Sequence, residues 1–91
     1  AGDIKNQTEI HAALMLYKAR ALKCLGLLTV ARDTASAALR RKKDRSIELL
    51  LALRYERALI YNKMGQKARA RADFERIYAE APDYEDVAKR L

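Results

Sequence analysis

Proline and glycine are scarce in this sequence, with one proline and three glycines among 91 residues. An all-β domain would use these residues in its many turns, so their scarcity argues against that class. Cys24 and His11 are the only cysteine and histidine, so the chain can build neither an intrachain disulfide nor a Cys/His metal site of its own. We expect a reducing, cytoplasmic setting, with Cys24 as a small packing residue and His11 near the surface of a helix.

Several other features are missing, and each excludes a class of protein. No run approaches the ~20 apolar residues that a membrane span needs, and the first ten residues contain no apolar core of a signal peptide. The sequence has no glycine-rich phosphate loop, no HExxH and no GxSxG, and we find no recognisable set of acid, base and nucleophile. We therefore expect no enzyme, no cofactor and no membrane contact. Because the chain begins without methionine, we also expect a processed product or a fragment of a longer protein.

Helix-forming residues dominate what is present, and the chain is 51% hydrophobic and 34% charged. This composition is too apolar for a disordered chain and is typical of an all-α domain. The formal net charge of +7 is unevenly distributed, because residues 66–91 carry six charges of each sign. The excess therefore lies in residues 1–65 and is concentrated in a short block that we call the basic edge. Its residues are Arg40, Arg41, Lys42, Lys43 and Arg45.

Apolar residues recur at helical spacing in five segments, and no segment shows the sustained alternation of a strand. Gly26 and Gly65 each end a helix in the position that glycine favours, and Pro82 stops another. The expected helices run over residues 9–25, 28–41, 47–64, 67–80 and 83–91.

Residues that can cap helix N-termini precede three of these segments. Thr8 precedes the first helix, Asp44 or Ser46 the third, and Asp83 the fifth. Their side-chain oxygens can accept a hydrogen bond from a backbone N–H that has no partner within the helix.

The two halves of the chain repeat one pattern. Gly26 and Gly65 are 39 residues apart, and the same shift places Ala31 on Ala70. Self-similarity with a period of roughly 20 to 50 residues is typical of helical solenoids. Positions 31, 35, 38 and 39 share their spacing with Ala70, Phe74, Ile77 and Tyr78, which we expect to face inward, while Arg69, Arg71 and Arg76 are expected in solvent.

The second half resembles the tetratricopeptide repeat, whose pattern over about 34 residues has an aromatic residue and glycine near the first turn, then A-x3-F, then proline. Ala58 takes the small position at which the paired helices approach. The matching residues are Tyr61, Gly65, Ala70, Phe74 and Pro82. Arg54 and Arg57 depart from the family, because they stand at its tryptophan and leucine positions.

The first half matches the same pattern less completely. Ala35 stands where Phe74 stands in the second half, and Lys43 occupies the proline position. The resemblance implies a single tetratricopeptide-like domain over residues 1–91, with repeats at about 8–43 and 46–81 and a capping helix at about 83–91. About three repeats are usually needed for stability. We therefore expect either missing upstream repeats or self-association through Ile10, Leu14, Leu16 and Tyr17.

The family resemblance implies a protein–protein interaction module, a scaffold or adaptor whose first helices line a concave groove for a peptide or partner surface. Basic residues in the groove would favour an acidic partner. The predicted groove does not match the carboxylate clamp of some family members, because Leu16, Arg20 and Glu56 replace its polar residues. The groove residues are Leu16, Arg20, Lys23, Tyr55, Leu59, Asn62 and Lys63, with Ala13, Cys24 and Ala52 beside them.

The basic edge has two interpretations. Cations at a helix C-terminus offset the negative end of its dipole. The same block could instead contact phosphates or an acidic protein, which makes a nucleic-acid-associated or regulatory module the alternative function. No aromatic residues are interleaved with the block, and no helix-turn-helix, RRM or KH signature is visible, so nucleic acid is the less favoured partner.

Overall fold

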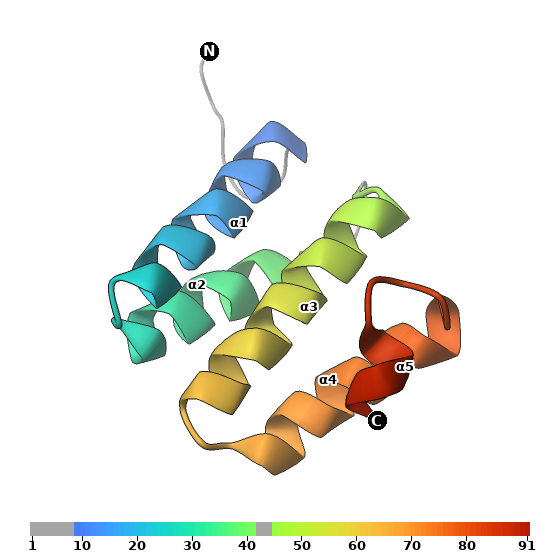
Figure 1. The fold of residues 1–91 in the computed structure, drawn as a ribbon. Coiled ribbons are helices and arrows are strands. Elements are labelled where there is room, and N and C mark those ends of the chain that lie inside the picture. The colour runs from blue at the N-terminus through green and yellow to red at the C-terminus, as the bar shows by residue number, and fades with distance from the viewer. Residues whose placement is uncertain (1–8, 42–44) are drawn as a thin grey trace.

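Five helices follow one another in the computed structural model of the chain, which describes residues 9–41 and 45–91 (Figure 1). The described residues contain no strand, which confirms the all-α prediction. The helices are α1 (Glu9–Cys24), α2 (Leu28–Leu39), α3 (Ile47–Lys63), α4 (Lys67–Glu80) and α5 (Val87–Arg90).

The turns after α1 and α3 have the same hydrogen bonds at the 39-residue shift. The amide of Leu27 donates to the carbonyl of Leu22, and the amide of Gln66 donates to that of Tyr61, each at 2.9 Å. Gly26 and Gly65 have φ of +83° and +79°, the left-handed conformation that favours glycine. This is the Schellman arrangement that ends a helix, so the predicted glycine turns are confirmed.

A predicted N-terminal cap is observed for α3 but not for α5. The hydroxyl of Ser46 accepts a hydrogen bond from the amide of Leu49 at 3.1 Å and caps α3. Asp83 does not cap the last helix, because turns fill residues 82–86 and Glu85 takes a positive φ of 46° before α5 starts. Thr8 and Asp44 lie outside the described residues.

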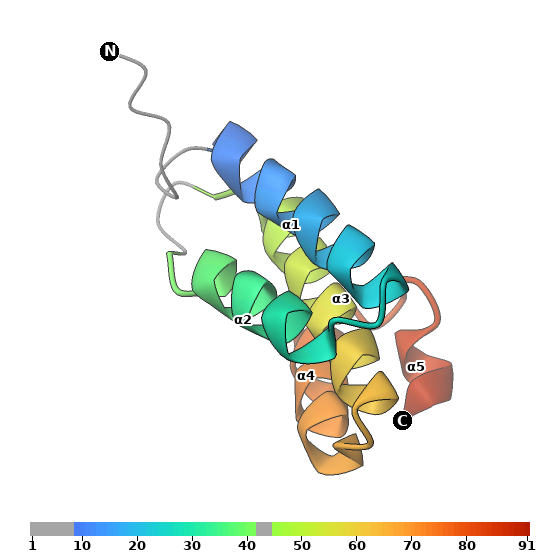
Figure 2. The same cartoon turned by 90° about the vertical axis from the view of Figure 1, so that its left-hand side faces the viewer.

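The helices lie in two layers. Figure 1 shows α1, α3 and α5 on the side nearer the viewer, with α2 and α4 behind them, and the turned view in Figure 2 agrees. α3 packs against α1, α2 and α4, so it is the central element, and α5 packs on α4. Antiparallel pairs α1–α2 and α3–α4 therefore follow one another along the molecule.

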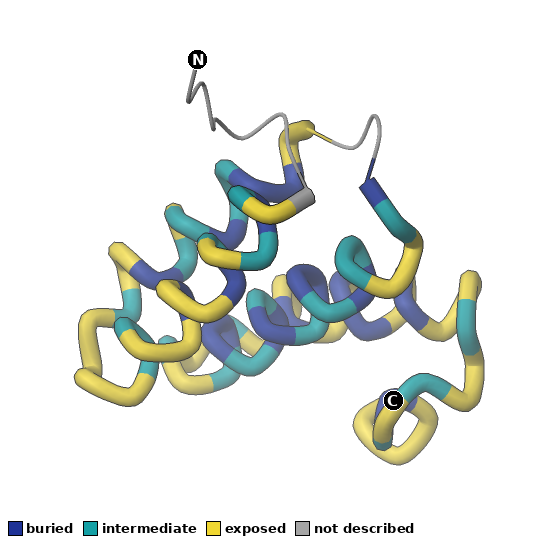
Figure 3. The backbone as a smooth tube through the Cα atoms, turned by 90° about the horizontal axis from the view of Figure 1, so that it is seen from above, coloured by how far each residue is buried: buried dark blue, intermediate teal, exposed yellow. Residues whose placement is uncertain are grey.

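Small residues allow the helices to approach closely, and one aromatic ring fills the second pair. Ala31 and Ala70 are 0% and 1% exposed, and Phe74 is 2% exposed. The buried parts of the tube in Figure 3 lie along the helix surfaces that meet. The prediction of a core built from alanine and Phe74 is confirmed. The fully buried alanines are Ala12, Ala19, Ala31, Ala35, Ala38 and Ala58.

Three predicted locations are wrong. Leu16 was expected on an open surface, but it is only 6% exposed and packs with Leu39 and Leu53. Tyr78 was expected in the core but is 43% exposed, because the buried stripe of α4 runs through Asp73 instead. Cys24 was expected to pack, but it is an exposed free thiol at the end of α1.

Candidate interaction surface

Two of the predicted groove cations share one buried carboxylate. Glu56 on α3 is 3% exposed, and its Oε1 accepts a hydrogen bond from Arg20 Nε on α1 at 3.1 Å. Lys23 pairs with the other carboxylate oxygen, and its side chain is only 16% exposed. This cluster ties α1 to α3, and it leaves Arg20, with a side chain 48% exposed, as the more accessible cation.

Tyr55 holds the segment that contains α5. Its hydroxyl and the carboxylate of Asp86 form a short hydrogen bond. Its ring makes edge contacts with the rings of Phe74 and Tyr84, at centroid distances of 5.7 and 5.8 Å. Arg90 lies 5.9 Å from the centre of the Tyr55 ring and donates from Nε to Asp86 at 3.0 Å. The predicted groove residue is thus half-buried beneath the C-terminal segment.

The contacts around Tyr55 explain the pKa shifts of the groups beside it. Burial raises the pKa of Tyr55, and its hydrogen bond to Asp86 raises it further. The bonds from Tyr55 and Arg90 lower the pKa of Asp86. Burial and the negative charge of the neighbouring Glu85 raise the pKa of Tyr84.

The other predicted groove residues occupy different environments. Leu59 is half-buried against the core of the second helix pair, and Lys63 is exposed. Asn62 lines a separate cavity of about 220 Å³ with Phe74 and Arg90. Leu16 belongs to the core, so the structure does not bring all seven predicted residues together on one open surface.

Two of the predicted groove residues each pair with a tyrosine, Arg20 with Tyr17 and Tyr55 with Tyr84, and we call these four residues the aromatic face. Tyr17 is 60% exposed, and the guanidinium of Arg20 lies 5.7 Å from the centre of its ring. Tyr17 lies three residues before Arg20, so helical spacing could have placed it on this face. Tyr84 lies in a turn, and only the folded chain reveals its place.

The basic edge is not one continuous surface. Arg40 and Arg41 are exposed at the end of α2, whereas Arg45 is 8% exposed. Lys42 and Lys43 lie outside the described residues.

Asp73 on α4 is the shared partner of two arginines on α3, Arg54 and Arg57. Arg57 donates from Nε and Nη2 to the two oxygens of Asp73 at 2.8 and 2.7 Å, and from Nη1 to Ser36 at 3.3 Å. Arg54 Nη1 lies 3.7 Å from the same carboxylate. Hydrogen bonding to Asp73 raises the pKa of Arg57. This charged cluster links α2, α3 and α4.

An apolar cavity of about 390 Å³ lies on the outer side of the α1–α2 pair. Leu14 and Val30 line it and are 57% and 49% exposed, and Ile10 nearby in sequence is 68% exposed. The predicted apolar surface on the first helix therefore exists at Ile10, Leu14 and Tyr17. The cavity is lined by His11, Leu14, Met15, Lys18, Val30, Asp33, Thr34 and Ala37.

Within residues 9–41 and 45–91, no helix has the length and apolar character needed to cross a bilayer. The same residues contain no cluster of three His, Cys, Asp or Glu side chains suited to a metal ion. Comparison of the chain with protein-family models, curated proteins and solved structures finds no match.

Proposed function

We propose that this chain is a protein–protein interaction module of the tetratricopeptide type, a scaffold or adaptor that binds a peptide or partner surface. The observation that carries this proposal is the aromatic face. Tyrosine and arginine are enriched among the residues that dominate binding energy at protein interfaces. Arg20 lies over the ring of Tyr17 on α1, and Tyr55 on α3 makes an edge contact with Tyr84 in the C-terminal segment.

The repeated turns support the assignment to the tetratricopeptide type. The hydrogen bonds around Gly26 recur around Gly65 after 39 residues. In such a solenoid, each helix pair buries its apolar face against the next pair. The exposed Leu14 and Val30 then lie where a further repeat would stack.

The cations of α1 and α3 favour an acidic partner. Arg20 and Lys23 share the single carboxylate of Glu56, so one positive charge is left over there. Lys63 adds an exposed cation at the end of α3. Charge complementarity of this kind raises the association rate and the specificity of binding.

The proposal can be tested without knowing the partner. Peptides are selected from a random display library on the immobilised chain, and their affinities are compared for wild type, Tyr17→Ala and Tyr78→Ala. Both tyrosines are largely exposed on helices, but only Tyr17 belongs to the aromatic face. We expect Tyr17→Ala to weaken the selected peptides about tenfold or more, and Tyr78→Ala by less than about twofold.

Two results would count against an interaction role for this face. One is that selection enriches no peptide over the naive library. The other is that both tyrosine variants lose affinity equally. Amide chemical shifts that move on α2 and α4 but not on α1 and α3 would place binding elsewhere.

Self-association through the outer side of the α1–α2 pair is the second partner that the proposal includes. Leu14→Glu would place a charge in the apolar cavity there. If wild type forms dimers, sedimentation equilibrium should show that Leu14→Glu is monomeric, while Tyr78→Glu still dimerises.

A further inference from the structure

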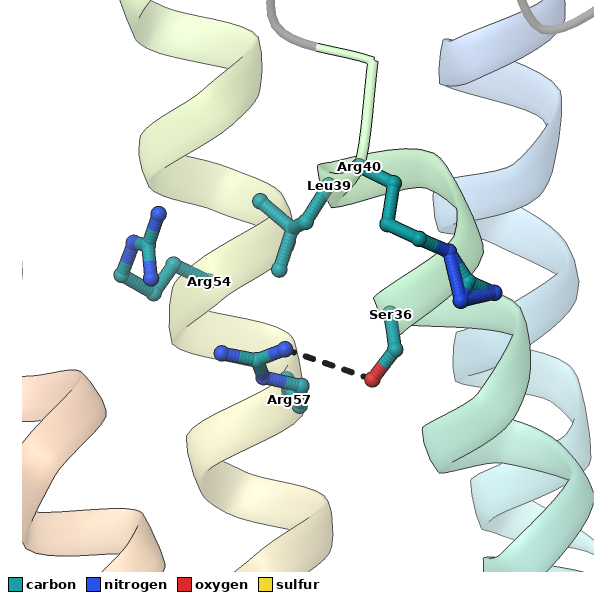
Figure 4. Close-up of a pocket in the computed structure, with 5 residues that line it drawn as sticks. All are labelled: Ser36, Leu39, Arg40, Arg54 and Arg57. Carbon is teal, nitrogen blue, oxygen red and sulfur yellow. Dashed lines mark hydrogen bonds between the residues drawn. The ribbon is translucent and has the colours of Figure 1, made fainter.

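A third cavity, of about 360 Å³, lies between α2 and α3, and three of the five residues that line it are arginines. Figure 4 shows the five residues that line it: Ser36 and Leu39 on α2, Arg40 just after α2, and Arg54 and Arg57 on α3. Arg57 is directed at the hydroxyl of Ser36, to which it donates a hydrogen bond. Neither the aromatic face nor the repeat architecture gives this cavity a role.

The positive charge around the cavity exceeds the negative charge. Asp73 is the carboxylate in contact, and Arg57 already binds both of its oxygens at 2.7 and 2.8 Å. Arg54 reaches Asp73 only at 3.7 Å, the outer limit of an ion pair. Arg76 adds a further repulsive charge near Arg54. Glu80 also acts on Arg54, more weakly than these neighbours. Within the part of the chain that the structure describes, two carboxylates therefore face four arginines when Arg40 is included.

Arg54 is poorly compensated for a buried cation. Its side chain is 11% exposed. Loss of hydration lowers the pKa of Arg54, and the attraction of Asp73 opposes this effect. A buried charge without full pairing destabilises the folded chain, so an anion that enters the cavity would recover part of that free energy.

We propose that this cavity binds a phosphate group. Phosphate is a compact, doubly charged acceptor, and planar guanidinium groups bind its oxygens in pairs. Arg54 and Arg40 supply donors from two helices, and Ser36 supplies a hydroxyl. A water molecule takes up about 30 Å³, so the cavity has room for a phosphate together with the group that carries it.

The phosphate could belong to inorganic phosphate or to a phosphorylated side chain of a protein segment. The site is separate from the aromatic face, because it uses Arg54 and Arg57 rather than Tyr55 of α3. The failure of one proposal therefore leaves the other intact.

Isothermal titration at constant ionic strength tests the site with three probes: inorganic phosphate, a phosphoserine peptide and its unphosphorylated twin. The variants are Arg54→Met, Arg40→Gln and the control Arg69→Gln. Arg40 and Arg69 are exposed, and Met at 54 keeps an apolar chain of similar length, so we expect all three to fold, as circular dichroism will check.

We expect Arg54→Met and Arg40→Gln each to weaken phosphate binding about tenfold, and Arg69→Gln by less than about twofold. Equal affinity for the two phosphate probes would identify free phosphate as the ligand. Binding of the phosphopeptide about tenfold more tightly than inorganic phosphate would identify a modified protein segment. The proposal is overturned if neither phosphate probe binds at about 10 mM, or if either folded site variant keeps wild-type affinity. It is also overturned if Arg69→Gln loses as much phosphate affinity as the two site variants.

Discussion

Removing the carboxylate of Asp73 should destabilise the fold strongly, and removing Arg57 as well should recover part of that loss. Asp73 and Arg57 have side chains that are 7% and 19% exposed, and they are joined by two hydrogen bonds of 2.7 and 2.8 Å. The informative substitutions are Asp73→Leu, Arg57→Leu and the double variant. Leucine at 57 is also the residue that the tetratricopeptide pattern has at this position.

The expected losses of unfolding free energy depend on which buried charge loses its partner. Loss of one partner of a buried ion pair costs about 3–5 kcal/mol. Asp73→Leu leaves Arg57 and Arg54 without a carboxylate, and because Arg57 keeps some access to water we expect a loss of about 3 kcal/mol. Arg57→Leu leaves Asp73 with Arg54 at 3.7 Å, so we expect a smaller loss of about 2 kcal/mol.

The double variant should lose no more than about 2 kcal/mol, since only Arg54 then lacks a partner. The two substitutions would fall short of additivity by about 3 kcal/mol. Urea unfolding followed by far-ultraviolet circular dichroism gives the four free energies of unfolding. Losses that add to within about 0.5 kcal/mol would refute the claim that these residues form one buried unit.

Two further predictions concern the core and the C-terminal segment. Phe74→Ala should lower the free energy of unfolding by about 3–5 kcal/mol, and Tyr78→Ala by less than about 1 kcal/mol, in the same urea assay; equal losses would contradict the burial of one ring and the exposure of the other. The bonds from Tyr55 and Arg90 lower the pKa of Asp86 in the folded state, so they stabilise the fold at pH values above 3.8, the ordinary pKa of aspartate. This stabilisation is lost as the pH falls through the lower pKa of the folded state. The side-chain Nε resonance of Arg90 should therefore move below that pH in wild type, and an identical titration in Asp86→Asn would refute the assignment.

Local signals in the sequence predicted much of the fold. Glycine at 26 and 65 and proline at 82 bound the helices, and the predicted limits of α4 agree with those observed. The alanine spacing identified the surfaces on which helices meet, because only small side chains permit that approach. Such features act over a few residues, so the order of residues is enough to recognise them.

Contacts between distant residues were harder to predict. A hydrophobic pattern predicts that Tyr78 is buried and Asp73 exposed. Asp73 is buried instead, because Arg57 on the neighbouring helix gives its carboxylate a hydrogen-bonded partner. Cys24 looked like a packing residue, yet it lies at the exposed end of α1. The aromatic face also depends on the path of the chain after Pro82, which brings Tyr84 onto Tyr55.

The central structural claim is that two helix–turn–helix units 39 residues apart are equivalent, and alanine at the two glycines tests it most directly. A side-chain Cβ at Gly26 or Gly65 would meet no atom within 4 Å, so the cost of alanine comes from the positive φ alone. We predict that Gly26→Ala and Gly65→Ala each lower the free energy of unfolding by about 1–2 kcal/mol, with the two values equal within error. A substantial loss at one glycine with none at the other would contradict the equivalence of the two units.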